Sequence, residues 1–210
     1  MKTKLVMFDY DGVLADSNHL PKLYYDELAK LIGSKRFETM DECREYMEVD
    51  FQITLKRLGI VDPEHVKIAE KLFRSMDVDW KNLELFPAVK EMLIELKNKG
   101  YIIAIVTNNN EETVVYDLKR HGIMQYFDYI IDRKYGYKPA VDQILHCLKI
   151  TGVKPEEAVM IDDMDGGIIA AKNAKLKKAI GVSYGYQLPY RLHMADVIVD
   201  APEKIIGVLE

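Results

Sequence analysis

The sequence lacks the features that mark a secreted or membrane-spanning protein. Its 210 residues include only two cysteines, Cys43 and Cys147, and neither belongs to a C-x-x-C or Cys/His spacing. Isolated cysteines of this kind indicate a reducing compartment. No apolar run approaches the roughly 18 residues of a membrane span, and the first apolar stretch is too short for a signal peptide. We therefore expect a cytoplasmic protein.

The sequence also has no excess of basic charge. Lys and Arg number 29 against 34 Asp and Glu, which gives a net charge of -5, and there is no long basic run. This balance argues against a nucleic-acid or membrane-surface partner. No internal repeat, low-complexity segment or G-x-G-x-x-G motif is present, so a dinucleotide-binding protein is disfavoured. Both a monomer and a homodimer are compatible with the sequence.

The apolar pattern that is present predicts a parallel sheet. Hydrophobic residues make up 49% of the chain, and short apolar runs alternate with helical periodicity from residue 86 onward. Strands are expected at 4–9, 101–107, 126–132, 158–163, 178–183 and 196–200, with a last helix at 202–210. Strands separated by helices require right-handed crossovers. The predicted fold class is α/β, a Rossmann-like doubly wound parallel sheet.

Residues 17–82 interrupt this alternation with a block that is predicted to be helical throughout. Thr39 with Glu42 three residues later forms a capping box, and apolar residues recur at helical spacing from Met40 to Leu58. Asp62 followed by Pro63 starts a further helix. We predict that 17–82 is an inserted α-helical cap domain and that 1–16 and 83–210 form the core.

Polar residues follow four of the predicted strands, where a doubly wound sheet binds its ligands. They are Asp9 and Asp11 after the first strand, Thr107, Asn108 and Asn109 after the second, Lys138 after the third, and Asp162 and Asp163 after the fourth.

Crowded carboxylates repel one another, and a hard cation such as Mg²⁺ would neutralise them. The lysine and the Thr107 hydroxyl suit a phosphoryl group held beside that cation. An Asp carboxylate such as Asp9 can attack phosphorus, and Asp11, on the same face of an extended strand, can reach the leaving oxygen.

At this point the sequence resembles the haloacid dehalogenase superfamily, in particular its phosphoglycolate-phosphatase-like members with an α-helical cap. The segments "FDYDGVLADS", "IVTNN", "GYKPAVDQIL" and "VMIDDMDGGIIAAKNA" are similar to its four motifs, in order, over the whole chain. The resemblance implies a nucleophile at Asp9 and a general acid/base at Asp11. It implies phosphoryl contacts from Thr107, Asn108 and Lys138. It also implies Mg²⁺ held by Asp9, the Asp11 backbone carbonyl and Asp163.

The sequence departs from the family pattern in the fourth motif. Many members have G-D-x-x-x-D there, and Gly167 stands where the second acid would be. A double-Asp variant fits "IDD", with Asp163 as the metal ligand and Asp162 bonded to backbone or to a metal-bound water. Either Asp162 or Asp165 could take the missing role. The presence of Asp11 disfavours carbon–halogen cleavage, because the dehalogenases themselves lack this second acid.

The expected function is Mg²⁺-dependent hydrolysis of a small phosphate monoester, of the phosphoglycolate or sugar-phosphate type, through a phosphoaspartate. A sugar-phosphate mutase of the same superfamily and a non-catalytic regulatory protein are the alternatives. Read singly, Asp9 and Asp11 could be turn residues and Lys138 could merely precede a helix. His19, Arg44, Lys56 and Arg57 could contact substrate, although a solvated surface is the commoner role for such residues.

Overall fold

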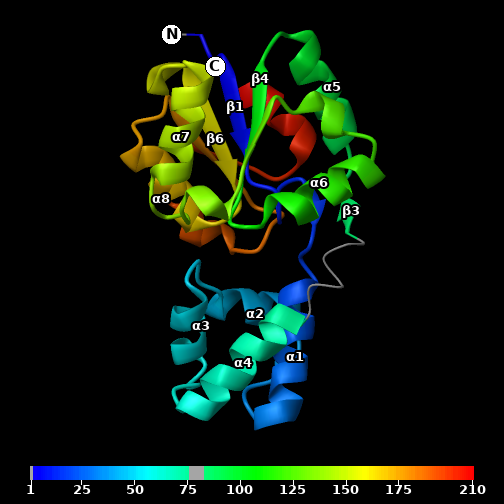
Figure 1. The fold of residues 1–210 in the computed structure, drawn as a ribbon, viewed down its shortest axis with the longest axis vertical. Helices are drawn as coiled ribbons and strands as arrows, with labels where there is room; N and C mark the ends of the chain where they lie inside the picture. The colour runs from blue at the N-terminus through cyan, green and yellow to red at the C-terminus, as the bar shows by residue number, and fades with distance from the viewer. Residues whose placement is uncertain (1, 76–82) are drawn as a thin grey trace.

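The computed structural model describes residues 2–75 and 83–210, and its centre is a six-stranded parallel sheet (Figure 1). The strand order is β5-β4-β1-β6-β7-β8, so β1 lies inside the sheet between β4 and β6. The strands are β1 (Leu5–Phe8), β4 (Ile102–Val106), β5 (Tyr129–Ile131), β6 (Ala158–Asp162), β7 (Lys178–Val182) and β8 (Val197–Val199).

Helices cover both faces of this sheet. Val6 and Phe8 of β1 pack toward α5 (Val89–Asn98) and α6 (Glu111–Arg120), whereas Leu5 and Met7 pack toward α7 (Asp142–Thr151) and α8 (Asp165–Asn173). Alternate residues of one strand therefore enter two different cores, which is why β1 is apolar without a break. The predicted fold class, with its inserted helices, is confirmed.

The four described helices between residues 17 and 75 gather around a core of their own, below the sheet in Figure 1. They are α1 (Leu20–Ile32), α2 (Met40–Tyr46), α3 (Phe51–Arg57) and α4 (Pro63–Ser75). We call these helices the cap. Tyr24, Tyr25, Leu28, Phe37 and Leu55 form the centre of its core, with aromatic rings in edge-to-face contact. The domain limits at 16/17 and 82/83 stay a prediction, because residues 76–82 lie outside the described residues.

A short antiparallel ribbon joins the cap to the core. β2 (Ala15–Asp16) pairs with β3 (Glu84–Leu85), so Ala15 faces Leu85 and Asp16 faces Glu84. This ribbon is absent from the sequence-based expectation, since strands of two residues carry no detectable periodicity. The chain thus enters and leaves the cap through adjacent strands.

Buried polar contacts tie the ribbon to the first motif. The Tyr10 hydroxyl donates to Asp117 Oδ2, and the fully buried Asp117 also accepts from Arg120 Nε at 2.8 Å. The Arg120 guanidinium donates to the carbonyl of Leu83, next to β3. A buried network of this kind holds its members in one arrangement because an unpaired group there would be costly.

Two helical predictions are wrong in detail. The segment from Met40 to Leu58 forms two helices, because the chain is extended at Met47 and the Asp50 side chain caps α3 through Gln52 N. The predicted last helix is a pair of 3-10 turns, Pro202–Lys204 and Ile206–Val208. Other 3-10 turns are Met124–Tyr126, Arg133–Tyr135, Pro155–Glu157 and Pro189–Leu192.

Within the described residues, no helix has the length and apolar character needed to cross a membrane. The cytoplasmic location inferred from the cysteines is a separate matter and stays a prediction.

Candidate active site

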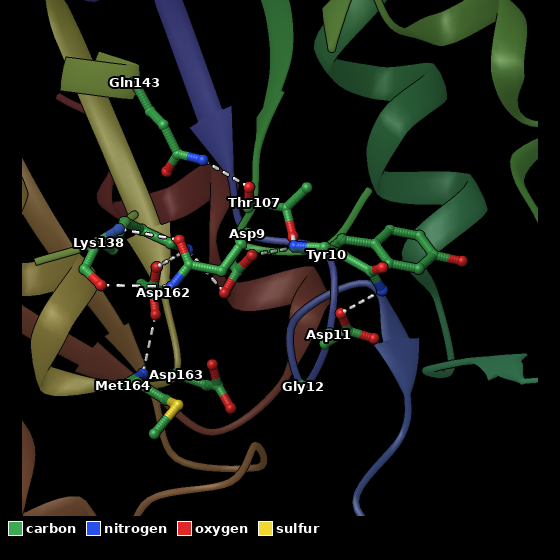
Figure 2. A network of polar contacts seen from close by, with 12 residues as sticks. Asp9, Tyr10, Asp11, Gly12, Thr107, Lys138, Gln143, Asp162, Asp163 and Met164 are labelled. Atoms are coloured by element: carbon green, nitrogen blue, oxygen red, sulfur yellow. Dashed lines mark hydrogen bonds and ion pairs between the residues drawn. The ribbon is translucent and has the colours of Figure 1, made fainter. Parts of the chain in front are cut away.

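The carboxyl ends of β1, β4 and β6 bring Asp9, Thr107 and Asp162 to one edge of the sheet (Figure 2). The register of β1 against both neighbours sets their height, and Asp9 N donates to Ile161 O at 2.9 Å. We call this edge the rim. The predicted topology alone indicates that these residues lie close together, and in the structure they do.

Lys138 lies between two carboxylates at the rim. Its Nζ is 2.7 Å from Asp9 Oδ2 and 2.7 Å from Asp162 Oδ2, and its side chain is 3% exposed. Burial by itself would lower the pKa of Lys138, but the charges of Asp162 and Asp9 outweigh it and raise the pKa above its ordinary value. The lysine is therefore a fixed cation, and it reaches the rim from the segment that follows β5.

Asp11 lies beside the second motif. Its Oδ2 accepts a hydrogen bond from Asn109 Nδ2 at 3.0 Å, while its Oδ1 is buried and has no partner among the described residues. Burial raises the pKa of Asp11 to about 7, and the charge of Asp9 adds to this rise. A carboxyl group in this state can hold a proton near neutral pH, which is what a general acid requires.

A cluster of three carboxylates could hold a divalent cation. One oxygen each of Asp9, Asp162 and Asp163 lie within 4.8 Å of one another, and the cluster is buried. Asp163 Oδ2 accepts from Tyr186 N at 2.6 Å, whereas its buried Oδ1 has no partner among the described residues. Burial and the nearby carboxylates raise the pKa of Asp163 well above its usual range. An all-oxygen set with an unpaired buried oxygen fits a hard cation such as Mg²⁺.

Asp162 differs from Asp163 because both of its oxygens have protein partners. Oδ1 accepts from Met164 N at 2.9 Å, and Oδ2 pairs with Lys138. Burial raises the pKa of Asp162 to about 7, and the charge of Lys138 acts against that rise. The two neighbouring acids of "IDD" thus point to different surroundings, as alternation along a strand predicts.

Gly167, where many family members have an acid, has no room for one. A Cβ built on Gly167 would lie 1.8 Å from Asp162 Oδ2 and 2.1 Å from its Cγ. Asp162 therefore fills the volume that a side chain at position 167 would need. Asp165 is the other acid that could take this role. Its Oδ1 instead accepts a hydrogen bond from Gln187 Nε2 at 3.1 Å.

Two amide side chains fix the phosphate-binding candidates. Asn108 Oδ1 accepts from Lys138 N at 2.8 Å, so the second and third motifs are joined directly. The buried Gln143 of α7 donates from Nε2 to the Thr107 carbonyl at 2.6 Å. The Thr107 hydroxyl accepts from Asn109 N at 3.1 Å, which leaves its own hydrogen available to another acceptor.

Between the rim and the cap lies a cavity of about 280 Å³ that residues of both line. Asp9, Asp11, Thr107, Asn108 and Asn109 form its floor. Most of its remaining lining comes from apolar and aromatic residues of the cap, including Tyr24, Phe51 and Phe73. His19, Arg44, Lys56 and Arg57 are not among the lining residues.

Sequence reasoning missed three residues of the site. Tyr186 contacts Asp163 through its backbone and Ser17 through its hydroxyl, and it follows β7 in the run Tyr184–Gly185–Tyr186. Examining the end of the fifth strand by the same rule as the others would have found it. Asn109 follows the second predicted strand, but its position in the sequence predicts no role for it. Gln143 is a buried polar residue in a helix, and only its packing against Thr107 reveals what it does.

The four motifs, in order and converging at one rim, define a member of a known family. A model of the haloacid dehalogenase-like hydrolases matches residues 6–181, and the chain belongs to that family. The prediction of an enzyme of this superfamily is confirmed.

Curated relatives show two kinds of activity in their names. A phosphoglycolate phosphatase of Nitrosococcus oceani is 30% identical over 98% of this chain and 93% of its own length. A pyrophosphatase of Bacillus cereus is 29% identical over 85% of this chain and 83% of its own length.

Solved structures share the fold. A haloacid dehalogenase-like hydrolase from Streptococcus pneumoniae has a TM-score of 0.84 at 20% identity, with 99% of each chain covered. A Thermotoga maritima structure described as a candidate β-phosphoglucomutase has a TM-score of 0.70 at 28% identity, with 99% of this chain and 98% of that chain covered.

Proposed function

We propose that the chain is a Mg²⁺-dependent phosphatase that hydrolyses a small phosphate monoester through a phosphoaspartate on Asp9. The observation that carries this proposal is the position of Asp9. Its carboxylate lies on the cavity floor, 2.7 Å from Lys138 Nζ and in one cluster with Asp163. A carboxylate held in place beside a fixed cation is suited to attack an anionic phosphoryl group.

Asp9 and Asp11 divide the covalent chemistry between them. An oxygen of Asp9 bonds to phosphorus while the bond from phosphorus to the ester oxygen breaks, and Asp11 gives its proton to the departing alcohol. Asp11 then takes a proton from water, and that water attacks the phosphoaspartate and releases phosphate and free Asp9. The buried Oδ1 of Asp11, which has no partner among the described residues, is the atom available to carry this proton.

In this proposal, three groups hold the phosphoryl oxygens. Lys138 Nζ has three N–H donors and uses two of them on carboxylates, so one remains. The Thr107 hydroxyl has a free hydrogen. Both Asn108 side-chain atoms bond the Lys138 backbone, so Asn108 would contribute its own backbone N–H. These contacts orient the phosphorus toward Asp9.

Mg²⁺ would be held by Asp9 and Asp163 and, by family resemblance, by the Asp11 backbone carbonyl. When bound there, it would screen the repulsion between the carboxylates and the phosphoryl group. Asp162 would hold Lys138 in position.

The test is phosphate release from a panel of monoesters with and without Mg²⁺, beginning with phosphoglycolate because relatives are named for it. We expect Mg²⁺-dependent release, and a loss of at least ~10³-fold in kcat/KM for Asp9→Asn. Asp200→Asn removes an exposed carboxylate that does not line the cavity and serves as the matched control. Near-normal turnover by Asp9→Asn would contradict the covalent mechanism.

The same experiment separates a mutase from a hydrolase. A mutase returns the phosphoryl group to substrate, so with sugar phosphates it would yield an isomer and little free phosphate. Free phosphate as the main product supports hydrolysis.

A further inference from the structure

The cap side of the cavity is mainly aromatic and apolar. Tyr24, Tyr25, Met47, Val49, Phe51 and Phe73 contribute to this lining, whereas the rim side is polar. A substrate bound with its phosphoryl group at Asp9 must place its leaving group against this cap lining, because the two surfaces enclose one cavity. The chemistry of the cap lining therefore bears on which leaving group is accepted.

Three aromatic rings from α1, α3 and α4 form one cluster in this lining. The Tyr24 centroid is 5.7 Å from that of Phe51 and 5.9 Å from that of Phe73, and Phe51 and Phe73 are 5.1 Å apart. The Tyr24 hydroxyl is used up in a 2.8 Å hydrogen bond to the Ala69 carbonyl. Phe73 is nevertheless 47% exposed, so a ligand could still bury apolar ring surface there.

The charges of the cap do not suit an anionic leaving group. Arg44 pairs with Asp41 at 3.0 Å and Arg57 pairs with Glu48, and neither arginine lines the cavity. Among the described residues of the cap, Glu48 alone brings a charged side chain to the lining. Glu48 is paired with Arg57 and Arg191, so the described cap lining offers no unpaired cation to a second carboxylate or phosphate.

One lining cation, Arg133, belongs to the core. Its backbone N donates to Asn109 O at 3.2 Å, which places it beside the second motif at the level of the rim. No ion pair links its side chain to another described residue. From that position it can add positive charge near the phosphoryl group, whereas the cap lining offers no such charge.

We propose that the preferred leaving group of this enzyme is an uncharged alcohol with an aromatic or similarly flat apolar face, rather than a carboxylate or a second phosphate. This inference rests on the proposed phosphatase function. It separates the chain from relatives that are named for phosphoglycolate or pyrophosphate, and it assigns recognition to the Tyr24–Phe51–Phe73 cluster.

The test compares benzyl phosphate, 2-phosphoglycolate and ethyl phosphate. All three release a primary alcohol, so their intrinsic reactivities are similar and differences report on binding. We expect kcat/KM for benzyl phosphate to exceed both others by at least ~10-fold, the amount given by about 1.4 kcal/mol of added contact.

Variants of the cluster link this preference to its cause. Phe73→Leu and Phe51→Leu keep an apolar side chain but lose the ring, and each should lower kcat/KM for benzyl phosphate ~3- to 10-fold while ethyl phosphate changes less than about twofold. Ile53→Ala changes an exposed apolar residue of α3 that does not line the cavity, and it should leave all three esters unchanged. Arg133→Gln should lower all three alike.

The outcomes separate the two proposals. Release of phosphate from none of these esters and from no other monoester of the panel would overturn the phosphatase function and this inference with it. Hydrolysis that favours phosphoglycolate or ethyl phosphate over benzyl phosphate would overturn this inference and leave the phosphatase intact. A loss of phosphoglycolate turnover alone in Arg133→Gln, with phosphoglycolate the best substrate, would assign the leaving group to the anionic class.

Discussion

The rim and the cap lining face the same cavity but are built in opposite ways. At the rim, buried carboxylates and Lys138 hold one another in short contacts, and Asp11 Oδ1 and Asp163 Oδ1 have no partner among the described residues. The cap lining consists mainly of ring faces and aliphatic carbon, and the nearby Arg44 and Arg57 are paired with Asp41 and Glu48. We infer from this difference that the rim carries out the reaction and that the cap determines which substrate is accepted. Changes at the two surfaces should therefore have different signatures.

The largest expected effect is on metal binding at the rim. Asp163→Asn removes a charge from the carboxylate cluster and should raise the Mg²⁺ requirement by more than the ~10–100-fold that an outer-sphere partner costs. Asp162→Asn should lower activity within that ~10–100-fold range with a smaller change in Mg²⁺ requirement. Calorimetric Mg²⁺ titration and Mg²⁺-dependent phosphate release measure both. A larger loss of Mg²⁺ affinity in Asp162→Asn would show that the metal ligand is the neighbouring acid.

The second effect tests why Gly167 replaces an acid. Gly167→Asp forces a Cβ into the volume of Asp162 and should cost about 1–3 kcal/mol of stability, seen as a fall in Tm. The double variant Asp162→Gly, Gly167→Asp exchanges the two residues and should recover part of both stability and activity. Gly207→Ala is the control, since a Cβ added there would meet no described atom within 4 Å. Equal Tm values for the single and double variants would contradict this steric account.

A third effect concerns the contact that holds the cap on the core. Arg191 donates to the Met47 carbonyl at 2.9 Å and pairs with Glu48, in the loop between α2 and α3. Arg191→Met should loosen this loop, raise KM ~3- to 10-fold and increase amide exchange at residues 47–50.

Lys204→Met, which breaks an exposed pair with Asp200, should change neither quantity. Unchanged exchange at residues 47–50 in Arg191→Met would show that this contact does not hold the cap.

The smallest effect lies within the cap, away from the cavity. Thr39 Oγ1 accepts from Glu42 N at 3.1 Å at the start of α2. Thr39→Ala should lower the stability of the cap by about 1 kcal/mol and leave kcat/KM at 25 °C within about twofold. The stability of the cap is measured by denaturant unfolding with amide exchange in α2 as the readout. The value of kcat/KM is measured by phosphate release. A large fall in turnover would show that activity depends on cap stability at this level.

Much of the core could be predicted because its strands are buried on both faces. The unbroken apolar runs before Asp9 and Asp162 are typical of strands in a parallel sheet that helices cover on both faces. Because such a sheet binds ligands at the carboxyl ends of its strands, the ends of these runs predict the position of the rim. The C-terminal segment was wrongly predicted to be a helix because its buried residues have helical spacing. Ile205 and Leu209 are buried four residues apart, as in a helix, but the chain there forms two 3-10 turns, one on each side of Ile205.

The cap was harder to predict because the spacing of its apolar residues does not reveal a short break between two helices. Met47 and Phe51 are four residues apart, so the pattern continues while the backbone becomes extended and a new helix begins after Asp50. The contacts of Tyr186 and Gln143 depend on residues distant in sequence, and no local pattern specifies them. For the same reason, the sequence directed attention to the basic residues of the cap, whereas its rings line the cavity.

The pairing of Asp16 with Glu84 brings the two ends of the helical insertion together, so the insertion could be exchanged for another one. Its two ends are fixed one strand spacing apart, roughly 4.8 Å, so the ribbon carries the insertion as the connection of a hairpin. Loop-closure entropy grows slowly with loop length, so insertions of very different size would cost the core almost the same. An ancestor with a two-residue turn at this place could have acquired a cap without any change in the sheet. Exchange of the insertion between relatives would then alter which ester is cleaved while the apparatus of cleavage is inherited unchanged.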